Sequence, residues 1–195
     1  MPNLDNSALF DAYQREILAE STRARIGNSD LSRTAHKIAQ VLTKFNIPHS
    51  IVGGFAVQHH GYPRFTEDVD VVVPNVEEAR DKLSMNGFKE VQGTSMIITD
   101  RSNAVRVDLL PGGRSLSPKA QVMLPNPLTP QNTPSYVDLS ALISLKLDTY
   151  RHNPKRIQDL ADAGKLIENN NLPIDYPVDN HVKKEYEDLW RQVNS

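Results

Sequence analysis

Apolar residues recur at helical spacing in two stretches near the start of the chain. The first covers residues 4–25, and the second is "LSRTAHKIAQVLTKFN", residues 31–46. Apolar positions repeated every three or four residues predict a helix with one buried face in each stretch. Ser29 or Asp30 is the expected N-cap of the second helix, because a short polar side chain accepts hydrogen bonds from a first helical turn.

Short apolar runs follow, and they predict strands. One of them, "EDVDVVV", alternates acidic and apolar residues as a strand with two unlike faces does. The segment "NVEEARDKLSMNG" inserts a helix with Asn75 as its N-cap. The strand candidates are residues 49–52, 67–73, 88–92, 95–100 and 104–111.

Residues 111–137 break this regularity, since they are rich in Pro, Gly, Ser and Asn. We expect an irregular crossing with a short strand at residues 120–124. Such a long irregular segment is uncommon inside a domain and indicates a functional loop or a link. Helical spacing then returns, and it predicts helices at residues 137–153, 154–170 and 180–194, with Pro154 in the first turn of the middle one.

Together these elements predict an α/β (α+β) fold, in which a small mixed sheet is flanked by helices and followed by a C-terminal helical region. We expect three parts in the 195-residue chain. Residues 1–46 form N-terminal helices that pack on the core, residues 47–125 form the core, and residues 137–195 form the C-terminal helical region.

Composition narrows the class of protein. The chain has 22 Lys and Arg against 24 Asp and Glu, and this near-neutral balance argues against broad electrostatic binding of nucleic acid. The absence of cysteine excludes disulfides, thiolate metal sites and a cysteine nucleophile, and it fits a reducing cytoplasm. The N-terminus lacks the pattern of a signal peptide, and no apolar run reaches membrane-spanning length. We expect a cytoplasmic protein without a membrane partner.

Three aspartates in the strand candidates are the main chemical signal. Asp68 and Asp70 share one face of a strand because side chains alternate, and Asp108 lies in a later strand, "VRVDLLP". An edge strand with one solvated face would show the same alternation. Three carboxylates on neighbouring strands, however, are what hard cations such as Mg²⁺ bind, and two such ions can promote phosphoryl transfer.

A pair of glycines precedes the acidic strand. In "VGGFAV", Gly53 and Gly54 stand where a strand turns into a helix. Such a turn allows backbone N–H groups to approach a phosphate. The alternative is a simple tight turn. The glycines become more informative because the Asp-x-Asp strand follows them.

The stretch "GGFAVQHHGYPRFTEDVDVVV" resembles the signature of the DNA polymerase β-like nucleotidyltransferase superfamily. Its spacer is similar to a bacterial branch near the abortive-infection (type IV toxin–antitoxin) nucleotidyltransferases, in which Gly-Gly, an Arg and a Thr or Ser precede Asp-x-Asp. The distal segment "LISLKLDTYRHNPKRIQDLAD" also resembles that branch, and the resemblance covers about residues 47–165. Arg156 departs from the pattern, because it stands where an Asp is usual. The matching residues of the distal segment are Lys146, Arg151, Lys155 and Asp159.

The resemblance implies a minimal nucleotidyltransferase fold and the transfer of a nucleoside monophosphate from an NTP to an acceptor hydroxyl, with release of pyrophosphate. The implied cofactor is two Mg²⁺ ions, with Mn²⁺ as a substitute. Asp68 and Asp70 would bind both ions, and Asp108 would hold the catalytic ion and accept the acceptor's proton. Gly53 and Gly54 would cradle the triphosphate.

Four further residues are candidates for nucleotide binding. They are Arg64, Thr66, Lys146 and Arg151. Arg64 equally fits a structural ion pair, and Lys146 stands among aliphatic residues, from which a lysine can simply extend to water. Arg151 belongs with His152, Lys155 and Arg156 to the densest basic cluster of the chain, which is too small to define an RNA site.

The acceptor stays open between an RNA 3′ end, a protein hydroxyl and a small molecule. Toxin-like modification of tRNA, with a cognate antitoxin as partner, is the first hypothesis, and it rests on the resemblance. An antibiotic nucleotidyltransferase is the nearest alternative. A catalytically silent member that binds a nucleotide or a partner is the third, and Arg156 favours it, whereas the intact acidic and glycine motifs favour an enzyme.

Overall fold

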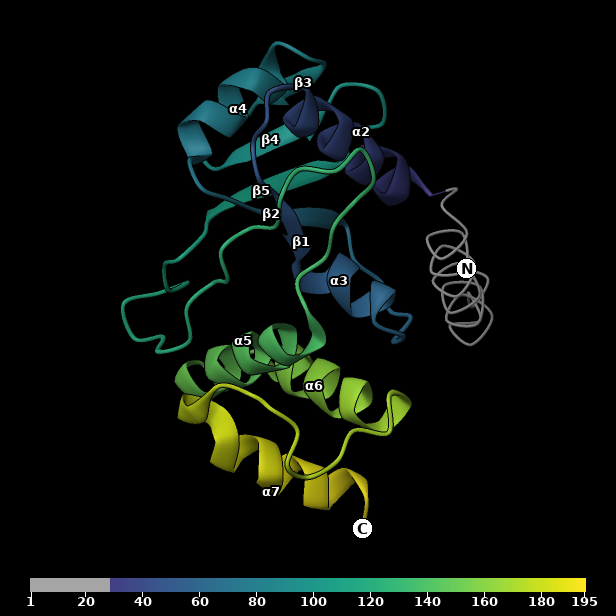
Figure 1. Ribbon diagram of the computed structural model, residues 1–195, viewed down its shortest axis with the longest axis vertical. Coiled ribbons are helices and arrows are strands. Elements are labelled where there is room, and N and C mark those ends of the chain that lie inside the picture. The colour runs from purple at the N-terminus through teal and green to yellow at the C-terminus, as the bar shows by residue number, and fades with distance from the viewer. Residues whose placement is uncertain (1–28) are drawn as a thin grey trace, which may run out of the picture.

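A five-stranded mixed sheet stands at the centre of the computed structural model, which describes residues 29–195 (Figure 1). The predicted helix at residues 4–25 lies outside the described residues. The strand order is β1-β2-β5-β4-β3. The strands are β1 (Ser50–Val52), β2 (Asp68–Val73), β3 (Phe88–Glu90), β4 (Ile97–Asp100) and β5 (Arg106–Pro111). The predicted fold class, a small mixed sheet flanked by helices, is confirmed.

The parallel pairing of β2 with β5 is the feature that positions the site. All other neighbouring strands run antiparallel. Parallel neighbours need a crossover, and here the chain between β2 and β5 forms α4 (Val76–Ser84), β3 and β4. As a result, β2 and β5 run in the same direction with their acidic residues in register.

Helices that precede and connect the strands pack on the sheet. Helix α2 (Asp30–Lys44) packs on α4 and on β2, whereas α3 (Gly53–His59) packs on β1 and β2. Side chains from the sheet and from helices before and after it form one continuous apolar core. Strand β2 lies inside this core, and its Val69, Val71, Val72 and Val73 are fully buried.

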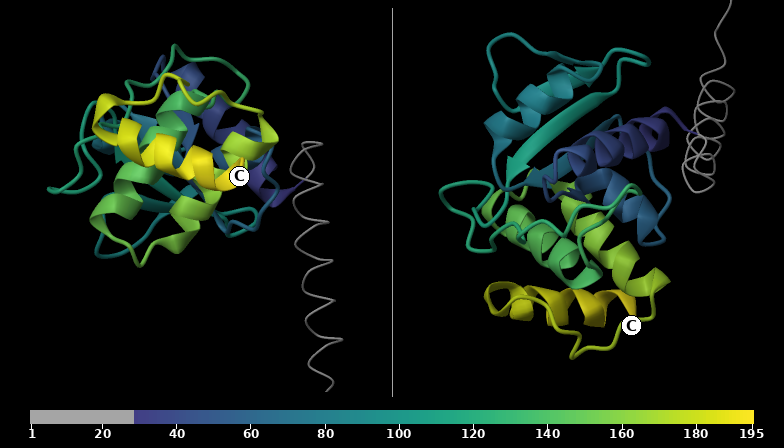
Figure 2. Two further views of the ribbon diagram at one scale, coloured as in Figure 1. Left: turned by 90° about the horizontal axis from the view of Figure 1, so that it is seen from below. Right: turned by 45° about the horizontal axis from the view of Figure 1, so that its top comes forward.

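The C-terminal helical region lies beyond one end of the sheet, next to α3 (Figure 1). Helix α5 (Leu139–His152) packs on α6 (Ile157–Asn169) and also contacts α3. A 3₁₀ turn (Asn180–Val182) leads into α7 (Lys183–Val193), which lies on the outer side of α5 and α6 (Figure 2). Within the described part of the chain, every helix is too short or too polar to cross a membrane.

Local capping signals are confirmed. The hydroxyl of Ser29 accepts a hydrogen bond from the backbone N–H of Ser32 (3.1 Å) at the start of α2. Asn75 accepts one from the N–H of Glu78 (3.2 Å) at the start of α4. Both caps depend on residues three positions apart, so sequence alone is sufficient to identify them.

The predicted helix start at Pro154 is wrong, because α6 begins at Ile157. The residue before a proline disfavours the helical region, and Asn153 is accordingly non-helical (φ −141°, ψ 84°). Pro154 and Lys155 form a turn that the N–H of Arg156 closes onto the carbonyl of Asn153 (2.9 Å). This turn places Arg156 at the N-cap of α6.

The predicted strand at residues 120–124 is also wrong, since it is reduced to a single bridge between Ser115 and Met123. The reason is a tertiary contact. The backbone N–H groups of Gln121 and Val122 donate to the buried carboxylate of Asp148 on α5, at 2.9 and 3.0 Å. These two N–H groups, which would pair with a neighbouring strand, therefore form hydrogen bonds with a side chain instead.

Candidate metal centre

Three carboxylates converge at the centre of the sheet. The parallel register places Asp70 of β2 directly opposite Asp108 of β5, and Asp68 lies two residues earlier on the same face as Asp70. Each of the three offers a carboxylate oxygen within 4.8 Å of the other two. The structure thus brings together the three acids that the sequence singled out.

The electrostatics of Asp70 fit a bound cation. The pKa of Asp70 is raised to about 7, first by burial and then by repulsion from Asp68 and Asp108, while Lys146 and Arg106 act in the opposite sense. The unbalanced negative charge would be relieved by a divalent ion, and carboxylate oxygens are the ligands that Mg²⁺ prefers. The residues present therefore fit the metal that the sequence motif implies.

Two neighbours hold the outer acids. Arg106 forks onto Asp108, with Nε at 2.7 Å from Oδ1 and Nη2 at 2.7 Å from Oδ2. The hydroxyl of Thr66 donates to Oδ1 of Asp68 (3.0 Å). Thr66 is thus beside the acids, as the sequence suggested, and its contact with a phosphate stays a prediction. Any ion on Asp108 shares that carboxylate with Arg106.

The two glycines start α3 and pack directly on the acidic strand. Gly53 has φ +69°, and a methyl group there would collide with Oδ2 of Asp70. A Cβ at Gly54 would lie 2.5 Å from Oγ1 of Thr66. Both positions require glycine for close packing alone, independently of any phosphate. Their predicted role as a phosphate cradle stays a prediction.

Arg64 links the segment before β2 to the helical region. Its Nε lies 3.0 Å from Oδ1 of Asp162, a fully buried acid on α6. Its Nη1 donates to the carbonyl of Phe65 (2.6 Å). The ion pair is the structural role that the sequence left open for Arg64.

Lys146 of α5 lies between two acids of α6. Its Nζ is 2.7 Å from Oδ1 of Asp159 and 2.8 Å from Oδ2 of Asp162, and the lysine is 8% exposed. Arg156 adds a contact from Nε to Oδ2 of Asp159 (2.5 Å). Burial raises the pKa of Asp159, but Lys146 and Arg156 outweigh it and the pKa is lowered overall. Lys146 therefore pairs with two buried acids and does not extend to water.

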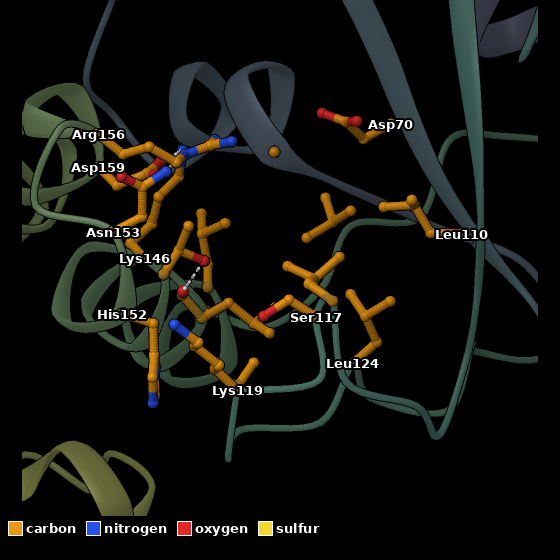
Figure 3. Close-up of a pocket in the computed structure, with 17 residues that line it drawn as sticks. Asp70, Leu110, Ser117, Lys119, Leu124, Lys146, His152, Asn153, Arg156 and Asp159 are labelled. Atoms are coloured by element: carbon orange, nitrogen blue, oxygen red, sulfur yellow. Dashed lines mark hydrogen bonds and ion pairs between the residues drawn. The ribbon is translucent and has the colours of Figure 1, made fainter.

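A cavity of about 530 Å³ lies between the acidic strand and the helical region (Figure 3). Asp70 and Gly53 line it on the sheet side, and Lys146, Asp159 and Arg156 line it on the helical side. The loop after β5 closes a third side with Ser117 and Lys119. Its apolar lining consists of Val52, Leu110, Leu116, Ala120, Leu124, Leu142 and Leu145.

Arg151 does not line this cavity. Its Nη2 lies 2.5 Å from Oδ1 of Asp148 and 2.7 Å from Oε1 of Gln121, and its Nη1 donates to the carbonyl of His181. Arg151 and Asp148 together hold the loop after β5 against α5. The structure thus places Arg151 away from the other predicted site residues, and a contact with nucleotide stays a prediction.

Sequence reasoning missed two cavity residues and one partner. Lys119 lay in a segment without regular spacing, and Arg156 was noted as part of a basic cluster and as a departure from the family pattern, without a place in the site. Asp162 follows Asp159 at helical spacing, so both lie on one face of α6. That spacing was the available signal for a second acid, although it did not identify Lys146 as the partner.

Comparison with known proteins yields distant structural similarity only. No protein-family model matches the chain, and no curated protein sequence matches it significantly. The crystal structure of ANT(2″)-Ia in complex with adenylyl-2″-tobramycin is 14% identical, with a TM-score of 0.46 over 82% of this chain and 96% of that one. The solution structure of the antibiotic-resistance factor ANT(2″)-Ia is 15% identical, with a TM-score of 0.46 over 80% and 89%. CdnC of E. coli MS115-1 with ATP is 18% identical, with a TM-score of 0.35 over 74% and 51%.

Substitution Gly53→Ala tests the packing of α3 on the acidic strand. We expect a loss of about 3 kcal/mol or more in the free energy of unfolding, because left-handed strain and overlap with Asp70 add up. Gly93→Ala is the matched control, since Gly93 has φ +84° and open space around it. Strain alone should cost it about 1–2 kcal/mol in urea denaturation. Equal losses in the two variants would contradict the packing argument.

Substitution Asp70→Asn tests the strain between the acids. In the folded protein the pKa of Asp70 is about 7, against an ordinary value of 3.8, so folding favours the protonated form. The free energy of unfolding should therefore fall as the pH rises from about 4 to about 7, by roughly 2–4 kcal/mol. Without metal, in EDTA, Asp70→Asn should be the more stable protein at pH 8, and the difference should vanish at pH 4. Glu67→Gln is the control, because Glu67 is exposed. If the wild type became more stable relative to Asp70→Asn as the pH rises, the predicted strain between the acids would be refuted.

Substitution Lys146→Gln tests the buried ion network. Removing the cation leaves two buried carboxylates uncompensated, and we expect a loss of about 3–5 kcal/mol in urea denaturation. Lys165→Gln on α6 is the control, because Lys165 pairs with Glu168 at an exposed position. That change should cost less than about 1 kcal/mol. Similar losses in both variants would show that the Lys146 network does not stabilise the fold.

Proposed function

We propose that this protein is a Mg²⁺-dependent nucleotidyltransferase, which transfers a nucleoside monophosphate from an NTP to an acceptor hydroxyl. The observation that carries the proposal is the convergence of Asp68, Asp70 and Asp108 beside a cavity of about 530 Å³. Cations line the opposite wall of that cavity. Carboxylates for metal on one side and positive charge on the other suit phosphoryl transfer, which depends mainly on positioning and charge neutralisation.

The chain's own residues have distinct roles in this reaction. Asp68, Asp70 and Asp108 would hold the ions, which when bound would neutralise charge on the attacking and leaving oxygens. The acceptor oxygen forms a bond to the α-phosphorus while the bond to pyrophosphate breaks. Asp108 takes the proton of the acceptor hydroxyl, and pyrophosphate leaves.

The lining of the cavity supports a nucleotide as the donor. Its apolar residues offer a surface for a base and ribose, and two polar groups of residues face each other across the cavity. One group is Asp70 with Gly53, and the other is Lys146 with Arg156. A nucleotide has the same division between an apolar base and a charged phosphate chain.

The charge of the cavity supports RNA as the acceptor over a polycationic antibiotic. A polycation is recognised by unpaired acids, and the cavity offers Asp70, which belongs to the metal site, and Asp159, which is already paired. Lys119 adds a positive charge on the loop side of the cavity, which favours an anionic partner instead. A toxin-like role with an antitoxin as partner is an extension of this proposal that rests on the sequence resemblance.

The proposal is tested by incubating the protein with each α-³²P-labelled NTP, Mg²⁺ and total RNA. We expect label in RNA with the wild type and at least a hundredfold less, in rough terms, with Asp68→Asn or Asp70→Asn, because each loses an ion ligand. Glu67→Gln is the control, since Glu67 is an exposed acid of the same segment and is not part of the triad. It should transfer label at the wild-type rate.

The acceptor is read from where the label goes. Label in the protein itself, or in an added aminoglycoside and not in RNA, would show that the acceptor is not RNA. The proposed nucleotidyl transfer would still be supported. Binding of NTP without transfer to any acceptor would favour a catalytically silent binder. A protein that neither binds NTP nor transfers label would refute the nucleotidyltransferase proposal.

A further inference from the structure

Arg156 occupies a place in the cavity that its position in the sequence did not reveal. It is the residue before α6, and it lines the cavity together with Lys146 and Asp159. In Figure 3 its side chain extends from the helical wall toward the side of the cavity where Asp70 lies. The side chain is 58% exposed although it is held at one end. It is therefore both tethered and accessible to a ligand.

We propose that Arg156 is a phosphate-binding residue, which contacts the triphosphate of the NTP from the wall opposite the metal triad. The inference rests on the proposed function and assigns one more residue to the same site. It concerns the ground-state binding of the donor, and not the acceptor.

The first argument is the charge of the ion network. Two acids of α6, Asp159 and Asp162, are surrounded by three cations. Lys146 contacts both acids and Arg64 contacts Asp162, so the acids are neutralised without Arg156. The network thus carries a surplus positive charge, and Arg156 is its most exposed member, with Lys146 at 9% and Arg64 at 18% side-chain exposure.

The second argument is the geometry of the guanidinium. Nε contacts Oδ2 of Asp159 (2.5 Å), and among residues 29–195 this is the one acid with which Arg156 pairs. The terminal nitrogens are left for another anion. A guanidinium presents its donors in a planar fork that matches phosphate oxygens, and a tethered guanidinium loses less freedom on binding.

The third argument is the position of Arg156 relative to the metal centre. The pKa of Arg156 is raised, first by its hydrogen bond to Asp159 and also by the charges of Asp70 and Asp162. Arg156 is thus close enough to Asp70 to sense its charge. Two Mg²⁺ ions on three carboxylates leave a single positive charge, which a triphosphate exceeds. A further cation across the cavity would neutralise part of that excess negative charge.

Calorimetric titration with inorganic tripolyphosphate in Mg²⁺ tests this role without any transfer reaction. We expect Arg156→Gln to weaken binding by about tenfold or more, because a charge-assisted hydrogen bond is lost. Arg156→Lys keeps the charge without the fork and should weaken binding by about threefold or more. Lys155→Gln is the matched control, since Lys155 is the adjacent exposed cation and does not line the cavity. It should bind within about twofold of the wild type.

Urea denaturation of each variant shows whether it is folded. If Arg156→Gln does not fold, the comparison of Arg156→Lys with the wild type decides. Wild-type affinity in a folded Arg156→Gln or Arg156→Lys, or equal weakening in Lys155→Gln, would overturn the inference, and so would a wild type that does not bind tripolyphosphate.

The inference and the proposed function can fail separately. Binding of tripolyphosphate that depends on Arg156, in a protein that transfers no label, supports the inference and refutes the reaction. Transfer of label with an unchanged KM for NTP in Arg156→Gln supports the reaction and overturns the inference.

Discussion

Repulsion among three carboxylates is the constraint around which this structure is organised. Asp68, Asp70 and Asp108 lie within 4.8 Å of one another because β2 and β5 run parallel with their acids in register. Like charges at that distance destabilise the folded chain unless cations compensate them. Arg106 supplies part of that compensation at Asp108, and Lys146 acts on Asp70 through space. The remaining charge is what makes the site suited to a divalent ion.

The second set of charges connects the helical region to the sheet. Arg64 precedes β2, Lys146 belongs to α5, and Asp159 and Asp162 belong to α6. Ion pairs that are mostly shielded from water cost desolvation energy, so they contribute more to a defined geometry than to stability. Here they fix α5 and α6 relative to the acidic strand. The same pairs thus shape the cavity and, through Arg156, give its far wall a positive charge.

The parts of the fold that depend on neighbouring residues were predictable. Strand alternation placed Asp68 and Asp70 on one face, and the caps at Ser29 and Asn75 follow from contacts three residues apart. The error at Pro154 has a local cause, the backbone restriction on the residue before a proline. The error at residues 120–124 arose because a residue distant in the sequence determined the local structure. Asp148 takes two backbone N–H groups of the loop after β5, and no strand forms there.

By itself, the sequence determined the order of helices and strands, the acidic triad and the glycines beside it, because local periodicity controls which side chains share a face. Only the tertiary structure decided how those faces meet. It turned Lys146 inward between two acids, directed Arg151 of α5 onto the loop after β5 and outside the cavity, and directed Arg156 into the cavity. The physical reason is that a buried cationic side chain must pair with a carboxylate. Helical spacing within one segment does not specify which other helix supplies that carboxylate.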